Sequence, residues 1–279
     1  MKPQRITFGR MHPNAGYTAQ YRREIRKLIK AMREDTKREI LAVYDDSKVQ
    51  DAKPKKKEKT IVEAMAVLRK RWYKIFEQNA RKMSRWLAEK VMKRTRKDIM
   101  KQLKDIGLAI QPNYSDTEKV LINGIVQNGV DLIKTIPQDY LRDVQTIVNE
   151  AVVRGGDRHT IWENIKDKFD HPLVNQRAGE SETDAIKRAE RRAELIAGDQ
   201  VQKATQEFAL NNAQAYGATK GEWIHVPGEK TSRITHIHFD GEIFDLNKGL
   251  YDDDVGEYVL PGQLIYCRCV FAAIFPGTE

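Results

Sequence analysis

The sequence predicts a mainly helical protein with a small C-terminal β unit, an α+β fold of long helices plus a small β-hairpin or sheet domain. First, apolar residues recur every three or four positions through most of residues 19–216. Second, this spacing gives way to alternation after Gly221, which is typical of strands. Third, the 279 residues are 40% hydrophobic, which is enough for a packed core. No run approaches 18 apolar residues, so we expect no membrane segment.

The N-terminal part is predicted to be an arm followed by two helices. Residues 1–17 contain prolines and glycines with little periodicity and are predicted to be an extended arm. Residues 18–106 form a basic helical region, with one helix over 19–44 and a long helix over 60–106. The Lys-rich stretch 48–59 between these helices has nothing to bury, and we interpret it as a linker.

Residues 107–279 are predicted to form a second domain. Its helical part covers 115–217, and its β unit covers 221–275. Pro137 lies where a helix would begin, so we expect separate helices on either side of it. The expected helices are 115–134, 137–154, 159–169 and 182–216. The expected strands are 222–226, 233–239, 242–246 and 263–275.

Charge is distributed unevenly along the chain. The net charge is +9, but residues 1–104 hold 31 Lys and Arg against 12 Asp and Glu, whereas residues 105–279 have a balance of −10. Such a split favours different partners for the two parts. The basic part, residues 1–104, would face either nucleic acid or an acidic surface. A solvated helix surface that is rich in Lys and Arg is the alternative. The candidate contact residues are Lys55, Lys56, Lys57, Lys59, Arg69, Arg71, Arg81, Arg85, Arg94 and Arg96.

Two histidines and two cysteines are the candidate metal ligands. On strands, residues two apart point to the same side, so His236 and His238 share one face and Cys267 and Cys269 share another. If the two strands face each other, the four side chains suit a structural zinc ion. The Cys-x-Cys spacing is unusual for zinc, and two buried thiols beside polar histidines remain the alternative. A disulfide between these cysteines is not expected.

The sequence contains no recognisable catalytic motif. No Ser-His-Asp order is present, and the acidic run 252–254 lacks the spaced ligands of a calcium loop. We therefore expect a protein that is not an enzyme. No base-reading motif occurs either, so contacts with double-stranded DNA would be nonspecific and would be made to phosphates.

The C-terminal half resembles the Mu F-like, SPP1 gene-7-like family of phage minor head proteins. The resemblance covers residues 140–275 and includes VVRGGDRHTIWENIKDKF, AELIAGDQVQKATQEFALNNAQAYG and GEWIHV. The family pattern then continues as R-x-x-H-x-x-L-D-G, P-G and N-C-R-C. The matching residues here are Trp223, Arg233, His236, Asp240, Gly241, Pro261, Gly262, Cys267, Arg268 and Cys269.

Three positions depart from the family pattern. Ala-Gly-Asp-Gln at 197–200 stands where the family has A-R-T-E, Phe239 replaces Leu, and Tyr266 replaces Asn. These departures leave His236, Cys267 and Cys269 in place.

The resemblance implies a structural minor head (minor capsid) protein of a tailed phage. Such proteins associate with the portal, assist head assembly, and are thought to help genome packaging or delivery. The implied partners are the portal protein, major capsid or scaffold proteins, and DNA. The implied location is the virion, inside the head near the portal vertex, after synthesis in the host cytoplasm. The alternatives are a metal-dependent enzyme or toxin-like module that uses the His/Cys cluster, and a general DNA-binding protein.

Overall fold

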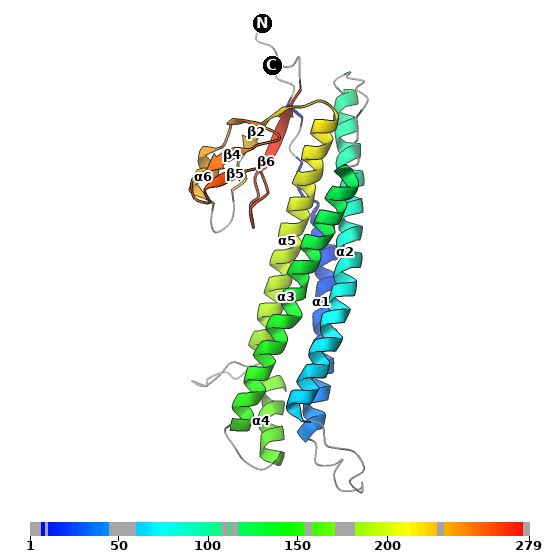
Figure 1. Cartoon of the computed structure of the whole chain (residues 1–279), viewed down its shortest axis with the longest axis vertical. Coiled ribbons are helices and arrows are strands. Elements are labelled where there is room, and N and C mark those ends of the chain that lie inside the picture. Colours follow the sequence, from blue (N-terminus) through cyan, green and yellow to red (C-terminus); the bar gives the residue numbers. More distant parts are fainter. Residues whose placement is uncertain are drawn as a thin grey trace. The chain divides into compact units, whose positions relative to one another are not determined.

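A computed structural model describes residues 7–8, 11–44, 60–105, 107, 112, 117–153, 158–170, 182–227 and 232–275 (Figure 1). The helices are α1 (Ala15–Tyr44), α2 (Ile61–Asp105), α3 (Thr117–Val153), α4 (Arg158–Asp170), α5 (Glu182–Ala215) and α6 (Ile234–His238). The strands are β1 (Thr7–Phe8), β2 (Lys220–Ile224), β3 (Ile243–Asp245), β4 (Leu250–Asp252), β5 (Glu257–Val259) and β6 (Val270–Ile274). The predicted fold class is confirmed.

The chain divides into two compact units, and α1, α2, α3 and α5 each contribute a segment to both. The sheet unit comprises the described residues within 1–21, 83–129 and 197–279, and the helical unit comprises those within 22–82 and 130–196. Among the described helices, none combines the length and apolarity that a membrane crossing requires. The predicted division into an arm, a basic helical region and a C-terminal domain stays a prediction.

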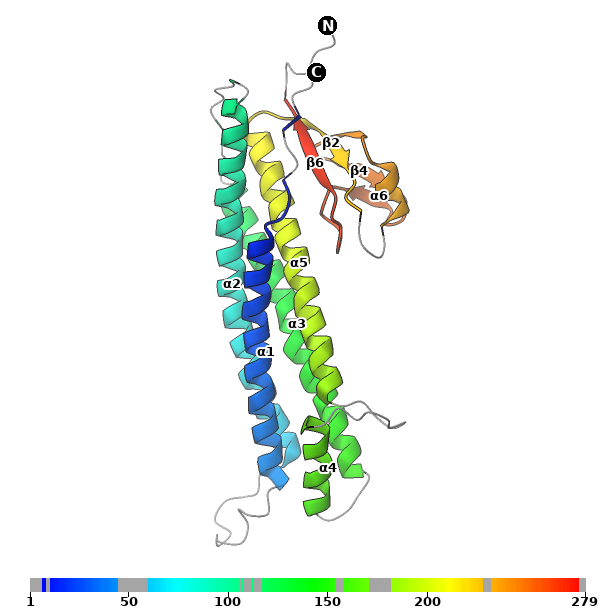
Figure 2. The ribbon, with the colours of Figure 1, turned by 180° about the vertical axis from the view of Figure 1, so that it is seen from behind.

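The sheet unit contains two antiparallel sheets. The larger sheet has the order β1-β6-β2-β3, and the smaller one pairs β4 with β5. In the larger sheet, Thr7 lies opposite Ile274, and Trp223 lies opposite Phe271. Strand β6 therefore lies inside the sheet, and all five of its residues are buried. Figures 1 and 2 both show the sheet beside the part of α5 that belongs to this unit.

Trp223 is the largest fully buried side chain of the sheet unit. Its ring makes edge contacts with His236, Phe239 and Phe244. Residues from α2, α5 and the sheet complete the same core, among them Ile99, Leu103, Ala209, Ala213, Tyr216, Leu246, Val259, Cys267, Cys269 and Phe271. Burial of an indole of this size anchors both the sheet and the short helix α6.

The helical unit packs four long helical segments with α4. Apolar residues at helical spacing face inward from each segment, including Ile25, Ile29, Met32, Leu68, Phe76, Ile133, Tyr140, Val144, Ile165 and Phe169. Arg33 of α1 donates to the carbonyl oxygen of Phe169, which links α1 to the end of α4. Packing of these stripes supplies most of the helix stability, because propensity alone is weak.

A buried carboxylate connects α1 and α2 within the helical unit. Asp35 is 7% exposed, and its Oδ2 accepts from Trp72 Nε1 at 2.8 Å and from Arg71 Nη1 at 2.6 Å. Arg38 pairs with the other carboxylate oxygen. Burial works to raise the pKa of Asp35, but the hydrogen bonds from Arg71 and Trp72 outweigh it and lower the pKa.

The helix predictions hold except at Pro137. The predicted break there is wrong, because α3 runs unbroken through it. Proline removes one backbone donor, but the inward-facing residues continue in phase on both sides, so packing retains the helix. Helix α1 begins at Ala15 rather than 19, because the Asn14 side chain accepts from the backbone N–H of Tyr17 and caps it. The predicted linker 48–59 lies outside the described residues.

The strand predictions agree with the structure only in part. Residues 233–239 were expected to be a strand, but 234–238 form the short helix α6. Strand β2 already pairs with β3 and β6, so it has no free edge for another strand. The hairpin of β4 and β5 was not predicted. The expected strand 263–275 is confirmed only for β6, because a turn precedes it.

Candidate metal centre

A tight turn before β6 positions the two cysteines. Gly262 has a positive φ of 78°, and the backbone N–H of Leu260 donates to Gln263 Oε1 at 2.8 Å. Tyr266 also has a positive φ, 60°, and its N–H donates to Asp199 Oδ1 at 2.8 Å. The turn thus brings Cys267 and Cys269 to the end of β6 with both side chains buried.

Helix α6 turns His236 toward these cysteines. The side chain is 1% exposed and lies against the rings of Trp223 and Phe239. Its Nδ1 is 3.4 Å from Cys267 Sγ and 3.7 Å from Cys269 Sγ. The described residues thus hold one cluster of metal-binding donors whose ligand atoms all lie within 4.8 Å of one another: His236, Cys267 and Cys269.

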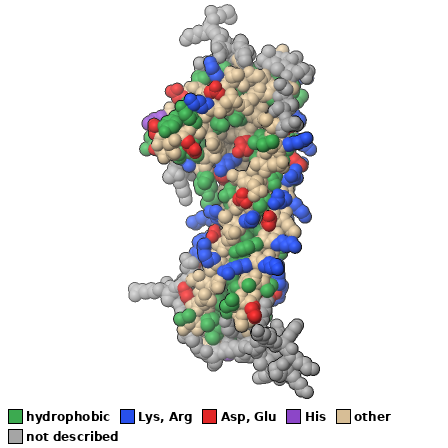
Figure 3. All heavy atoms as spheres, in the orientation of Figure 1, with side chains coloured by type: hydrophobic (Ala, Val, Ile, Leu, Met, Phe, Trp, Pro, Cys, Tyr) green, Lys and Arg blue, Asp and Glu red, His purple; other side chains and the backbone are tan. Residues whose placement is uncertain are grey.

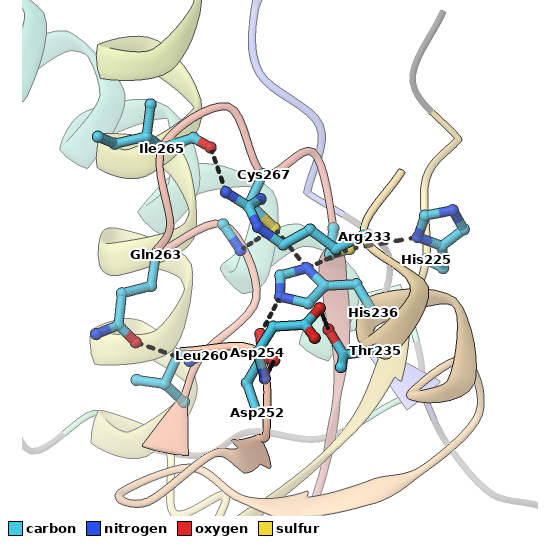
Figure 4. A network of polar contacts seen from close by, with 12 residues as sticks. His225, Arg233, Thr235, His236, Asp252, Asp254, Leu260, Gln263, Ile265 and Cys267 are labelled. Carbon is cyan, nitrogen blue, oxygen red and sulfur yellow. Dashed lines mark hydrogen bonds and ion pairs between the residues drawn. The ribbon is translucent and has the colours of Figure 1, made fainter. Parts of the chain in front are cut away.

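The other ring nitrogen of His236 faces a buried carboxylate. Nε2 lies 3.1 Å from Asp252 Oδ2, and Asp252 is fully buried. Figure 4 shows the His236 ring between Asp252 and Cys267. A carboxylate at Nε2 favours a proton on that nitrogen and leaves the Nδ1 lone pair directed at the sulfurs.

The two thiols differ sharply in acidity. The hydrogen bond from Cys269 lowers the pKa of the Cys267 thiol to about 4, with His236 acting in the same direction against burial. The same hydrogen bond and burial raise the pKa of Cys269. Both shifts thus have the hydrogen bond between the two thiols as their first cause.

His225 also reaches the cluster, and sequence reasoning missed it. Its Nδ1 lies 3.6 Å from Cys269 Sγ, and its backbone N–H donates to Asp240 Oδ1 at 2.8 Å. One sequence signal was available: His225 lies two residues after Trp223, so an extended chain places both on one side.

His238 lies outside the cluster. It is exposed, because residues two apart on a helix point in different directions. The structure thus brings together His236, Cys267 and Cys269, while the strand-face argument that included His238 is wrong.

The remaining motif residues hold the loops around the cluster. Arg233 donates to the carbonyl oxygen of Ile265 at 3.1 Å, and Gly241, with a φ of 84°, donates to the carbonyl oxygen of Trp223 at 2.8 Å. The backbone N–H of Gly262 donates to Cys267 Sγ at 3.4 Å. Pro261 is buried and Arg268 is exposed.

Most of the candidate contact residues on α2 have partners within the protein. Arg69 donates to Gln145, Arg71 pairs with Asp35 and Glu39, Arg81 with Glu77, Arg94 with Asp98 and Arg96 with Glu118. Arg85 is exposed. Lys55, Lys56, Lys57 and Lys59 lie outside the described residues. A charge count along the sequence cannot separate paired from unpaired bases, and the pairing emerges only from the fold.

A second set of bases on α2 is more exposed. We call Lys90, Lys93, Lys97, Lys101 and Lys104 the lysine stripe, because their spacing places them on one side of α2 within the sheet unit. All five are exposed, and within the described part of the chain none of them makes an ion pair. Figure 3 shows Lys and Arg side chains over α2.

The comparisons with known proteins point to one phage family. Residues 142–272 match the family model described as Phage Mu protein F like protein. We refer to residues 142–272 as the Mu F-like region, after the family model that matches them. An "Uncharacterized protein" from Haemophilus influenzae is 29% identical over 175 residues, which are 63% of this chain and 34% of that protein. The chain thus spans about a third of the length of this relative. No solved structure matches the chain.

The Mu F-like region contains His225, His236, Cys267 and Cys269, together with most of the sheet. Helices α1 and α2 lie outside it. The candidate metal ligands therefore belong to the matched region, whereas the lysine stripe does not.

The Mu F-like region carries strain at Tyr266. A positive φ suits Asn much better than Tyr, and the family pattern has Asn at this position. The Tyr266 side chain is 52% exposed, so little packing is lost on replacement. We expect Tyr266→Asn to stabilise the protein by about 0.5–1 kcal/mol. Urea denaturation measures this change in the free energy of unfolding. The control is Tyr258→Asn, at an exposed strand position, which should not stabilise the protein. A loss of stability in Tyr266→Asn contradicts the expectation.

Proposed function

We propose that this protein is a minor head protein of a tailed phage that associates with the portal and takes part in head assembly and genome packaging or delivery. The observation that carries the proposal is the Mu F-like match over residues 142–272. In this proposal the Mu F-like region docks to portal or capsid, and the protein acts structurally rather than as an enzyme.

Exposed apolar side chains of the sheet unit support a docking role. Ile234 and Ile237 on α6 are 68% and 47% exposed, and Tyr251 and Tyr258 of the smaller sheet are nearly half exposed. The two tyrosine rings contact each other with centroids 5.2 Å apart. Aromatic and aliphatic residues of this kind are typical anchors at protein interfaces.

Association with the portal has a direct test in phage particles. We expect the protein to be present in purified virions and to co-purify with the portal from procapsids. The combined change Ile234→Ser and Ile237→Ser should reduce recovery with the portal while leaving the fold intact, because both side chains are exposed. Val62→Ser and Val67→Ser, also exposed but on α2, are the matched control. Absence from virions would overturn the proposal.

The lysine stripe supports contact with DNA phosphates. Five lysines along 15 residues of helix span about 21 Å, so several phosphates of a duplex lie within their reach. An exposed ammonium that makes no ion pair binds phosphate at no cost in lost internal ion pairs, in contrast to Arg71 or Arg96. We therefore place the DNA contact on the stripe, inside the assembled head.

A salt titration of duplex DNA binding tests this contact. We expect Lys93→Glu, Lys97→Glu and Lys101→Glu together to weaken binding and to reduce the slope of log affinity against log salt by about 3. The matched control changes Lys119, Lys220 and Lys248 to Glu, which alters the net charge equally away from the stripe. An equal loss in both variants, or no binding by the unaltered protein near physiological salt, would contradict the DNA contact and favour an acidic protein partner.

A further inference from the structure

We propose that His225, His236, Cys267 and Cys269 bind one zinc ion in a tetrahedral site. The ion would join β2, α6 and the turn before β6. This inference concerns the stability of the sheet unit and does not depend on the proposed role in phage heads.

The distances between the donor atoms fit a shared ion. With Zn–S near 2.3 Å and Zn–N near 2.05 Å, a tetrahedral site separates sulfur and nitrogen ligands by about 3.6 Å. Cys267 Sγ and Cys269 Sγ lie 3.4 and 3.7 Å from His236 Nδ1, and Cys269 Sγ lies 3.6 Å from His225 Nδ1. Three donors, His236, Cys267 and Cys269, thus stand close to the spacing that one zinc ion imposes, and His225 reaches this group at Cys269.

Hydrogen bonding alone explains this arrangement less well. The Nδ1 atom of His236 has one in-plane lone pair, yet both sulfurs lie within 3.7 Å of it. Cys269 in turn lies near the Nδ1 atoms of both histidines. Two thiols and two imidazoles that converge in this way are better satisfied by a central cation than by weak S–H donors.

The surroundings are those of a metal ligand set. Asp252 accepts at Nε2 of His236, which is the carboxylate–histidine pairing that orients zinc-bound imidazoles. The backbone N–H of Gly262 points at Cys267 Sγ and supports a thiolate there. Two thiolates, two neutral imidazoles and Zn²⁺ carry no net charge, so the centre is neutral in its buried position.

The cluster also encloses a suitable space. A small cavity of ≈ 20 Å³ is lined by all four donor residues together with Val226, Ser232, Arg233, Tyr266 and Arg268. This volume holds about one water-sized particle. It leaves little room for a substrate, so the site fits a structural ion with four protein ligands rather than a catalytic ion with an open position.

Metal content and cobalt spectroscopy on the full-length protein test the proposal. We expect the purified protein to contain about one zinc ion per chain. Inductively coupled plasma mass spectrometry measures this content. Replacement by Co²⁺ should give the intense absorption of a tetrahedral thiolate site. The absence of both zinc and the cobalt signal from folded protein would overturn the proposal.

The fourth ligand is tested with a pair of histidine variants. His225→Ala should weaken Co²⁺ affinity at least 10-fold, while His238→Ala, a change on the exposed side of α6, should leave it unchanged. The reverse result, or equal effects, would overturn the assignment of His225.

Removal of the ion from the unaltered protein tests its contribution to stability without a change that could prevent folding. Variants at Cys267 or Cys269 can fail to fold, so the unaltered protein is treated with a chelator and its thermal midpoint is measured. We expect a lower midpoint that recovers on addition of Zn²⁺ but not of Mg²⁺, because Mg²⁺ avoids sulfur ligands. An unchanged midpoint, with zinc shown to be removed, would contradict a structural ion.

Discussion

Replacing Asp35 by Ala should lower the free energy of unfolding by about 2–4 kcal/mol. The loss follows from its partners: Trp72 Nε1 is buried and keeps no acceptor, and Arg71 retains only Glu39. Because Arg71 is 37% exposed, solvent replaces part of its lost ion pair and limits the cost. Urea denaturation followed by tryptophan fluorescence measures the change.

The effect of Asp35 also depends on pH in a defined direction. Its pKa in the folded state lies below the ordinary value, so it stabilises the fold above about pH 4 and loses this contribution as the pH falls. The stability gap between the unaltered protein and Asp35→Ala should therefore narrow in acid. Glu24→Ala, which removes an exposed ion pair with Lys27 on the same helix, should cost less than about 0.5 kcal/mol. A loss of similar size in both variants would contradict the buried network.

Gly129→Ala should destabilise the sheet unit by about 2–3 kcal/mol, although this change usually favours a helix. A Cβ at Gly129 would collide with Ser84 Oγ and would lie 3.1 Å from the Tyr21 hydroxyl. These two hydroxyls hydrogen-bond to each other at 2.7 Å, and burial raises the pKa of Tyr21 to about 12 against the effect of Ser84. The added methyl group would thus separate a buried pair whose members have no access to water.

The control for Gly129 lies in the same helix. At Gly124, no neighbouring atom lies within 4 Å of the position that a Cβ would occupy, so Gly124→Ala should stabilise the protein by up to about 1 kcal/mol. Opposite signs in thermal or urea denaturation are the expected result. A gain in stability in both variants would mean that α3 is not closely packed at Gly129.

Periodicity predicted the long helices because their stability rests on continuous apolar stripes. The same reasoning placed a break at Pro137, where the stripe in fact continues, because proline rules describe local backbone chemistry and packing overrides them. Residues 234–238 have the alternation of a strand, yet they form α6, and β3, which follows them, pairs with β2. A pattern within seven residues does not specify which strands will pair in the folded sheet.

The cluster of His236, Cys267 and Cys269 was partly predictable for a similar reason. Cys267 and Cys269 lie close in sequence and are typical zinc ligands together with histidine, so His236 was a candidate partner. Only the fold separates His236 from His238, since the helical turn buries one and exposes the other. His225 approaches through a long-range contact between β2 and β6, and Asp252 comes from a hairpin that the alternation did not reveal.

The pairing of β1 with β6 has a consequence for how the chain is made. Thr7 leaves the ribosome long before its partner Ile274, because residues 8–273 are synthesised between them. Contacts so distant in sequence close slowly, because the intervening chain must first lose much of its freedom. Until then β6 lacks its outer neighbour, and an unpaired strand edge is prone to join other chains. Preparation of the Mu F-like region without residues 7–8 would make that transient edge permanent.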